Sequence, residues 1–334
     1  MLKLVSKHID LDENWSDIAR ELGTELKDGM LTVPSQFGEG YMKVNQLLNG
    51  IKVAIGSISI NTVVLFSQPA IKDEWYLLRF ADLVLGGPLE FRIGNETLVD
   101  NSLNRSHVYL TSHRFDWSAM VSKGTTYKGI MILLNREWLA KYLEIDKHDD
   151  VFKEYLGLKI ATLDFEPMDQ EYRTCVDEII RENSQHPFHK IAAENRVMYI
   201  IERFFGRLHQ KIQEKRKGKL RLKNEEVWRL MDVEALLVKE SVQPPPTIPQ
   251  LAKIAAMSET RLKTNFKKIY GSNIYAYYQR NRMRKAREML LTGNFSVKEV
   301  GMDIGYSNLS HFTMAFKKEF NILPSELLAS AAMI

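Results

Sequence analysis

The sequence predicts an α+β chain of several domains, with an amino-terminal β-barrel or sandwich, helices after it, and an all-α carboxy-terminal domain. Three observations predict this architecture. The chain has 334 residues, more than a single hydrophobic core normally serves. Short β-branched and aromatic runs fill residues 30–135, and helical spacing of apolar residues follows them. Residues 1–206 carry 23 Lys and Arg against 30 Asp and Glu, whereas residues 207–334 carry 23 against 12, which indicates that the two parts face different partners.

The composition is that of a folded globular protein. Hydrophobic residues make up 45% of the chain and charged residues 26%, which excludes collagen-like and wholly disordered classes. Apolar runs are too short to span a bilayer, and charges occupy the amino terminus where a signal peptide needs apolar residues. We therefore expect a cytoplasmic protein without membrane contact. The single cysteine, Cys175, excludes an internal disulfide and a multi-thiolate metal site, and no cofactor is expected.

The amino-terminal elements are expected in a fixed order. We assign residues 1–165 to a β-rich domain, residues 166–215 to a helical region and residues 216–225 to a basic linker. Strand-like runs separated by Gly, Pro, Asn and Asp build the first domain, and helices begin at about residue 136, with one over DDVFKEYL at residues 149–156.

The longest of these helices carries a wide apolar stripe. Two interpretations remain open, namely packing against its own β-domain and pairing with the same helix of a second copy in a homodimer. The stripe consists of Ile191, Val197, Met198, Ile201, Phe204, Phe205, Leu208 and Ile212.

The basic third repeats one pattern of caps. Thr247 and Gln250 form a capping box that opens a short helix, and Ser258 caps a second helix that Gly271 ends. About fifty residues later, Ser296 and Glu299 form another capping box before a second pair of short helices. The two copies therefore predict two helix-turn-helix units.

Superposition of the copies separates buried from exposed positions. Small residues at Ala252 and Gly301 allow close helix crossing, and Ser258 aligns with Ser307. The opposite faces can reach base edges and phosphates, and the repeat, the caps and the basic charge favour this over faces that only meet water. These residues are Thr260, Arg261, Lys263, Thr264 and Lys267 in the first copy and Ser310, His311, Thr313, Met314 and Lys317 in the second.

A helix of about nineteen residues separates the units. It is expected to be capped by Ser272 and ended by Gly293. If rigid, it places the two recognition helices in adjacent major-groove segments about 34 Å apart. Its basic residues face phosphates or solvent, and Arg282 is a candidate for a structural ion pair with Glu288 or Glu299.

These motifs resemble the AraC/XylS family of bacterial transcription regulators. The resemblance covers residues 226–330 and implies an AraC-type DNA-binding domain with two helix-turn-helix units. Ala256 and Asn321 stand where the family often has Gly, and Leu328 stands where it often has Arg. The resemblance is carried by LAKIAAMSETRLKTNFKKIYG, RMRKAREMLL and VKEVGMDIGYSNLSHFTMAFKKEFNILPSELL. It implies base-reading roles for Thr260, Lys263, Thr264, Ser310, His311 and Met314.

For the amino-terminal region the resemblance is architectural only. It implies a cupin-like β-domain that senses a small-molecule effector, followed by helices that dimerise. His107 and His113 lack the arrangement of a metal-binding cupin, so no metal is expected. Aromatic rings offer stacking area and arginine binds anions. The ligand-binding candidates are therefore Trp75, Arg79, Arg92, Arg114, Trp117 and Tyr127.

The function expected is sequence-specific regulation of transcription. The partners are double-stranded DNA and an unknown effector, with a second copy of the chain and RNA polymerase as further candidates. One alternative is a DNA-binding regulator without an effector. Another is an enzyme domain fused to a DNA-targeting domain, but the sequence has no phosphate-binding loop, nucleophile elbow or zinc-hydrolase motif. We therefore expect that the protein is not an enzyme.

Overall fold

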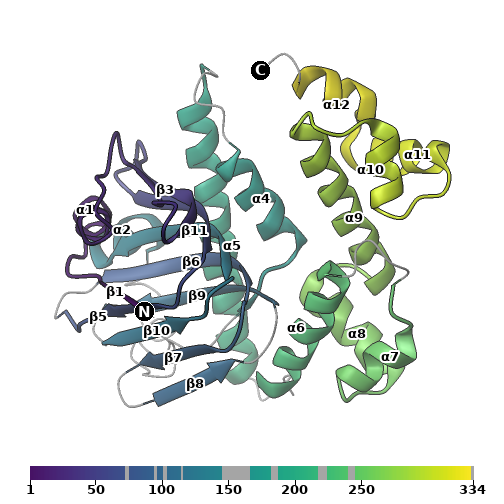
Figure 1. Cartoon of the computed structure of the whole chain (residues 1–334). Helices are drawn as coiled ribbons and strands as arrows, with labels where there is room; N and C mark the ends of the chain where they lie inside the picture. The colour runs from purple at the N-terminus through teal and green to yellow at the C-terminus, as the bar shows by residue number, and fades with distance from the viewer. Residues whose placement is uncertain are drawn as a thin grey trace. The chain divides into compact units, whose positions relative to one another are not determined.

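The computed structural model divides the chain into two compact units, residues 1–224 and 225–334 (Figure 1). No described helix is long and apolar enough to cross a membrane. The predicted helix over residues 149–156 and most of the predicted linker lie outside the described residues. The structure describes residues 1–71, 75–93, 96–100, 104–113, 116–144, 166–181, 187–216, 224–239 and 245–331.

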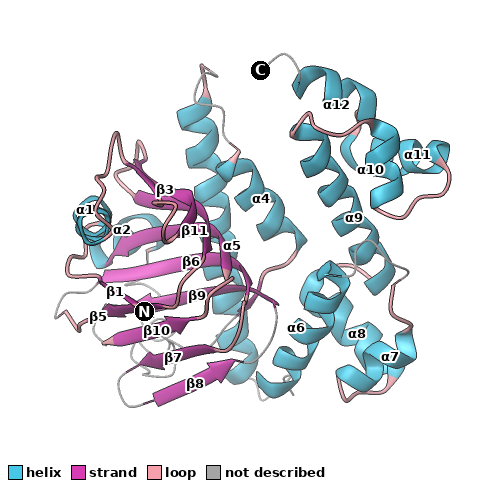
Figure 2. Cartoon of the chain, viewed as in Figure 1, coloured by secondary structure: helices cyan, strands magenta, loops and turns pink. Residues whose placement is uncertain are grey.

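Two β-sheets build the first unit (Figure 2). Neither sheet is closed into a barrel, so the barrel alternative of the sequence prediction is wrong. The strands pair antiparallel except β1 with β5. The five-stranded sheet has the order β1 (Leu2–Val5), β5 (Val64–Gln68), β10 (Trp117–Val121), β7 (Leu89–Ile93) and β8 (Glu96–Asp100). The seven-stranded sheet has the order β12 (Glu166–Pro167), β9 (Asn104–Ser112), β6 (Trp75–Val84), β11 (Thr126–Asn135), β4 (Lys52–Ile60), β3 (Gly38–Gln46) and β2 (Met30–Thr32).

The seven-stranded sheet is covered on both faces. Side chains alternate between the faces along each strand, so Leu78 and Phe80 of β6 join one core cluster and Leu77 joins another. The first cluster contains residues of α2 (Arg136–Leu143), α4 (Gln170–Ile180) and α5 (His189–Arg216). The second contains residues of the five-stranded sheet and of α1 (Leu11–Glu21).

The apolar stripe of α5 packs against the chain's own sheet. Val197 and Ile201 are fully buried, and Phe204 and Leu208 are nearly so, all within the cluster that includes the sheet residues Leu78 and Phe80. Ile191, at the start of the predicted stripe, is 53% exposed. The stripe is thus occupied within one chain, as one of the two interpretations predicted, and it does not support helix pairing in a dimer.

The regular elements among the described residues of the second unit are all helices. The capping residues of the linker helix α9 differ from the prediction by one position, because Asn273 and not Ser272 accepts the hydrogen bond from the first turn. The helices are α6 (Asn224–Lys239), α7 (Ile248–Ile254), α8 (Glu259–Tyr270), α9 (Ile274–Leu291), α10 (Val297–Asp303), α11 (Leu309–Phe320) and α12 (Pro324–Ala331).

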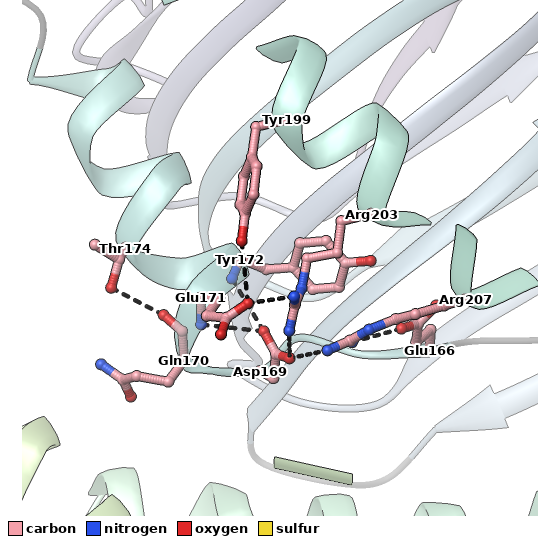
Figure 3. Close-up of polar contacts among 9 residues, drawn as sticks. All are labelled: Glu166, Asp169, Gln170, Glu171, Tyr172, Thr174, Tyr199, Arg203 and Arg207. Carbon is pink, nitrogen blue, oxygen red and sulfur yellow. Dashed lines mark hydrogen bonds and ion pairs between the residues drawn. The ribbon is translucent and has the colours of Figure 1, made fainter. Parts of the chain in front are cut away.

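A network of ion pairs fastens α5 to the start of α4 (Figure 3). Asp169, which is almost fully buried, caps α4 by accepting hydrogen bonds from the Glu171 and Tyr172 amides at 3.1 and 3.0 Å. The same carboxylate accepts hydrogen bonds from Arg203, at 2.9 Å, and from Arg207. Capping and ion pairing thus converge on one side chain.

The rings and charges around Asp169 complete this network. The Arg207 guanidinium lies 4.8 Å from the centre of the Tyr172 ring and also pairs with Glu166 at 2.7 Å. Burial raises the pKa of Glu166, although Arg207 opposes that change. Burial also acts against the charge of Asp169, but Arg207, the Tyr172 amide and Arg203 outweigh it, so the pKa of Asp169 is lowered.

We expect Asp169→Asn to destabilise the first unit by roughly 3 kcal/mol at pH 7, because asparagine can still cap α4 but removes the buried carboxylate that the half-buried Arg203 and Arg207 share, and leaves each with one acidic partner. The lowered pKa of Asp169 fixes the pH dependence. Its stabilisation is complete above the pKa of an unfolded aspartate, about 3.9, and is lost as the pH falls through the lower folded-state pKa. Urea unfolding should therefore show the difference from wild type shrinking below about pH 4.

Glu171→Gln is the matched control, because Glu171 pairs with Arg203 but keeps 56% of its side chain exposed. We expect less than about 1 kcal/mol for this variant. Equal losses for the two variants would show that Asp169 has no special position in the network.

Candidate functional site

The first helix pair of the second unit is formed by α7 and α8. The Gln250 side chain accepts a hydrogen bond from the Thr247 amide at 2.8 Å, and Ser258 caps α8 through the Arg261 amide at 3.3 Å, as predicted. The turn between the helices places Ala256 at a φ of 48°, in the left-handed region that favours glycine. The turn therefore keeps its shape although its residue is not Gly.

Aromatic packing fixes α8 against α9. The Phe266 ring lies 4.5 Å from Tyr270 and 5.4 Å from Tyr277, centre to centre. The Tyr277 hydroxyl lies 2.6 Å from the carboxylate of Glu234, a buried residue of α6. The inner face of α8 is thus held by two helices, which leaves its other face outward.

The second helix pair is formed by α10 and α11. Ser296 and Glu299 exchange the two hydrogen bonds of a capping box, at 2.8 and 3.2 Å. A Cβ added to Gly301 would lie 3.0 Å from the Phe312 ring, so the predicted close crossing is present. Asn308 caps α11, so the residue equivalent to Ser258 is Asn308 and not Ser307, with which the sequence superposition aligned it.

Arg282 anchors the second pair to the linker helix. Its Nε and Nη2 atoms donate hydrogen bonds to the Ile304 carbonyl at 2.9 and 2.6 Å. The guanidinium also lies 4.3 Å from the centre of the Tyr306 ring. Arg282 is therefore structural, as predicted, but its partner is the carbonyl at the end of α10 and not Glu288 or Glu299.

The predicted recognition faces point outward on both second helices. Two of their residues also make contacts within the domain, since Arg261 pairs with Glu226 of α6 and Lys263 lies 3.9 Å from Glu259. Both helices have a buried apolar inner face and an outer face of polar side chains. The exposed residues are Thr260, Arg261, Lys263, Thr264, Lys267, Ser310, His311, Met314 and Lys317, and Thr313 is half-buried.

The predicted ligand-binding residues of the first unit separate into three groups. Arg79 and Trp117 meet between the two sheets, 5.3 Å from guanidinium carbon to ring centre, and Tyr127 projects from β11 on the same side of the seven-stranded sheet. Trp75 lies on that side too, nearer the start of β6. Arg92 is exposed. Arg114 lies outside the described residues.

Four residues missed by the sequence prediction lie beside Arg79 or beside its neighbour Trp117. Thr111 accepts a hydrogen bond from the Arg79 guanidinium, and the Tyr109 ring centre lies 5.3 Å away. The other two are His113 and Gln68, whose side chain accepts a hydrogen bond from Trp117 at 2.8 Å. Residues 109 and 111 alternate along β9 and residue 113 follows its end, so strand periodicity could have placed them on one face once Arg79 was known to be inside.

Burial perturbs the titration of this interior. Burial, aided by the Arg79 charge, lowers the pKa of His113 to about 4, so its imidazole is neutral at pH 7. Burial raises the pKa of Tyr109 and of Tyr127. We define Gln68, Arg79, Tyr109, Thr111, His113, Trp117 and Tyr127 as the interior polar cluster. Among these residues Arg79 carries the charge.

Cys175, by contrast, shows no sign of reactivity. It is a half-buried thiol on α4, packed against the core cluster on the helical side of the sheet. Burial, together with Glu178, raises its pKa to about 11. The thiol is protonated at neutral pH, in contrast to the thiolate that nucleophilic chemistry requires.

Comparison with known proteins assigns the second unit. Residues 251–330 match the family of helix-turn-helix domains. The HTH-type transcriptional regulator ArgR of Pseudomonas aeruginosa is 29% identical over 91 residues, which are 27% of this chain and 28% of that protein. The HTH-type transcriptional regulator AlkR of Acinetobacter baylyi is 32% identical over 80 residues, 24% and 26% of the two chains. This chain therefore spans little more than a quarter of the length of these relatives.

Among solved structures, a probable AraC family transcriptional regulator from Rhodopseudomonas palustris is 27% identical. The match covers 31% of this chain and 96% of that one, with a TM-score of 0.29. Two capped helix pairs with polar outer faces define a DNA-binding domain of the helix-turn-helix class. The second unit therefore carries a helix-turn-helix domain similar to those of the AraC/XylS-type regulators that its motifs predicted. The matched relatives are named as transcriptional regulators, which agrees with the predicted class of protein.

We expect Arg282→Met to destabilise the second unit by about 2–4 kcal/mol, because it removes the hydrogen bonds to Ile304 and the contact with Tyr306. Arg280→Met is the control, since Arg280 pairs with Glu319 at 3.8 Å with 42% of its side chain exposed; we expect less than about 1 kcal/mol. Urea unfolding of both variants measures the difference. A loss for Arg280→Met as large as that for Arg282→Met would contradict the anchoring role.

Proposed function

We propose that the protein is a sequence-specific transcription regulator that acts in the cytoplasm and reads two adjacent major-groove segments with α8 and α11. The observation that carries this proposal is the pair of capped helix-turn-helix units, each with a buried apolar face and an exposed polar face, joined by one linker helix. Residues 207–334 contain 23 basic and 12 acidic residues. The resulting positive charge attracts this part of the chain to the phosphates of DNA.

The individual residues have distinct proposed roles. Lys263 suits the acceptor atoms of guanine, and Met314 suits the methyl group of thymine. Thr260, Thr264, Ser310 and His311 offer hydrogen bonds to base edges. Arg261, Lys267, Thr313 and Lys317 are proposed to contact the backbone, with Arg261 exchanging its partner Glu226 for a phosphate.

The proposal includes a small-molecule effector bound by the first unit. The interior polar cluster supports it, because a buried guanidinium and neighbouring polar groups are costly unless they have partners. An effector changes DNA binding only if it binds one arrangement of the protein more tightly than another. RNA polymerase is the further partner that a regulator of this kind would contact.

The test begins with genomic DNA fragments captured by the purified full-length protein, followed by salt titration of the recovered sites. We expect Lys263→Ala and His311→Ala each to weaken binding to the best site by roughly 5-fold to 150-fold, because each removes a base contact. Binding to random DNA should weaken much less.

Lys268→Ala is the control, because Lys268 is exposed on α8 outside the predicted recognition face. It should affect specific and random DNA equally. If Lys263→Ala and His311→Ala behave like this control, the two residues contact only the backbone, and base reading by these faces is refuted.

A further inference from the structure

The guanidinium of Arg79 lies between the two sheets with few partners. Arg79 is 5% exposed. Its side chain donates a hydrogen bond to Thr111 and lies beside the rings of Tyr109 and Trp117. Among the described residues no carboxylate pairs with it. A guanidinium has five N–H donors and is charged at any physiological pH, so an anion is the partner that this group lacks.

Three neutral polar groups nearby also lack partners. They are His113 Nδ1, the Tyr127 hydroxyl and Gln68 Nε2, all buried without a hydrogen bond. Two of their side chains, His113 and Gln68, are 3% exposed. Glycine at position 129 accommodates Tyr127, since a Cβ there would lie 3.0 Å from its hydroxyl. A buried polar group without a partner costs free energy, and several such groups beside one cation are typical of a binding site.

We propose that the interior polar cluster binds a small organic monoanion, a carboxylate on a flat apolar body, between the two sheets. This rests on the proposed effector function and names the chemical class of the effector. A carboxylate matches the planar fork of a guanidinium, and one cation balances one negative charge. The Tyr127 hydroxyl and the Gln68 amide supply further donors, while the rings of Tyr109 and Trp117 supply the walls for an apolar body.

The placement of the cluster connects such a ligand to the rest of the first unit. Gln68 and Trp117 belong to the five-stranded sheet, whereas Arg79 and Thr111 belong to the seven-stranded sheet. An anion held by both groups therefore ties the sheets together and favours one arrangement of them. Phe80, the next residue of β6, points to the other face, where its ring centre lies 5.1 Å from that of Tyr172 in the α4–α5 network.

A pocket lined by lysine side chains, elsewhere in the first unit, provides an internal control. It has a volume of about 150 Å³ and lies beside Lys43, His189 and Lys190, between the β3–β4 strands and helices α4 and α5. Its cationic side chains come from lysines that are half-buried or exposed. We therefore assign the ligand to the interior polar cluster, and Lys43→Met tests that choice.

The experiment is calorimetric titration of the full-length protein with acetate, hexanoate, phenylacetate and indole-3-acetate, each paired with its primary amide. We expect at least one ring-bearing carboxylate to bind about tenfold or more tightly than its amide. Arg79→Met should weaken that binding more than about tenfold, and Tyr127→Phe, which keeps the ring, by several-fold. Lys43→Met should leave it unchanged. Arg79→Lys keeps the charge but not the fork and should fall between wild type and Arg79→Met.

Several outcomes would overturn the assignment. These are carboxylates that bind no better than their amides, chloride or inorganic phosphate that binds as tightly as phenylacetate, and loss of binding in Lys43→Met instead of the Arg79 variants. If Arg79→Met does not fold, judged by urea unfolding, Tyr127→Phe and Arg79→Lys decide the question.

Binding to a recovered DNA site, measured with and without the carboxylate, separates this inference from the proposed function. Arg79-dependent carboxylate binding without any change in DNA affinity would support the site and refute its role as the effector site. A DNA response to some other molecule that persists in Arg79→Lys would support an effector and refute this site.

Discussion

The need to bury both faces of the seven-stranded sheet governs the first unit. One face is covered by α2, α4 and α5, and the other by the five-stranded sheet and α1. Each strand therefore sends alternate side chains to two different interiors. The apolar stripe of α5 is buried against one face of this sheet. Arg79 is enclosed on the opposite face, where the two sheets meet.

The two interiors differ in chemistry. The helical side is a continuous apolar core, sealed at one end by the ion pairs around Asp169 (Figure 3). Those charges are matched, with two arginines facing two acidic residues of β12 and the α4 cap. The side between the sheets contains a cation whose charge is not matched by a described carboxylate. Matched charges fix structure, whereas an unmatched buried charge with unpartnered neighbours is suited to bind something.

In the second unit, packing holds two helices, α8 and α11, so that each exposes a polar face. Phe266 and Tyr277 in the first pair, and Phe312 with Gly301 in the second, fix each recognition helix from its inner side. Arg282 fastens the second pair to α9 through the end of α10. The residues on the outer faces are not needed for packing, so their side chains can be suited to binding DNA.

The sequence by itself determined the features that depend on neighbours in the chain. The capping box of Ser296 and Glu299, the left-handed end at Gly271 and the helical spacing of α8 and α11 rest on groups a few residues apart, so local chemistry decides them. The choice of cap at Asn308 over Ser307 was missed because adjacent residues of similar capping strength compete, and helix packing settles the competition.

Only the tertiary structure decided the features that join distant segments. Nothing local distinguishes Ile304 from Glu288 as the partner of Arg282. Nothing local brings Trp117, which is held by Gln68, against Arg79. Local sequence also could not decide between a closed barrel and two open sheets, because strand order depends on pairing between segments far apart in the chain. Sheet register and the stacking of two sheets fix which side chains meet, and these are properties of the whole fold.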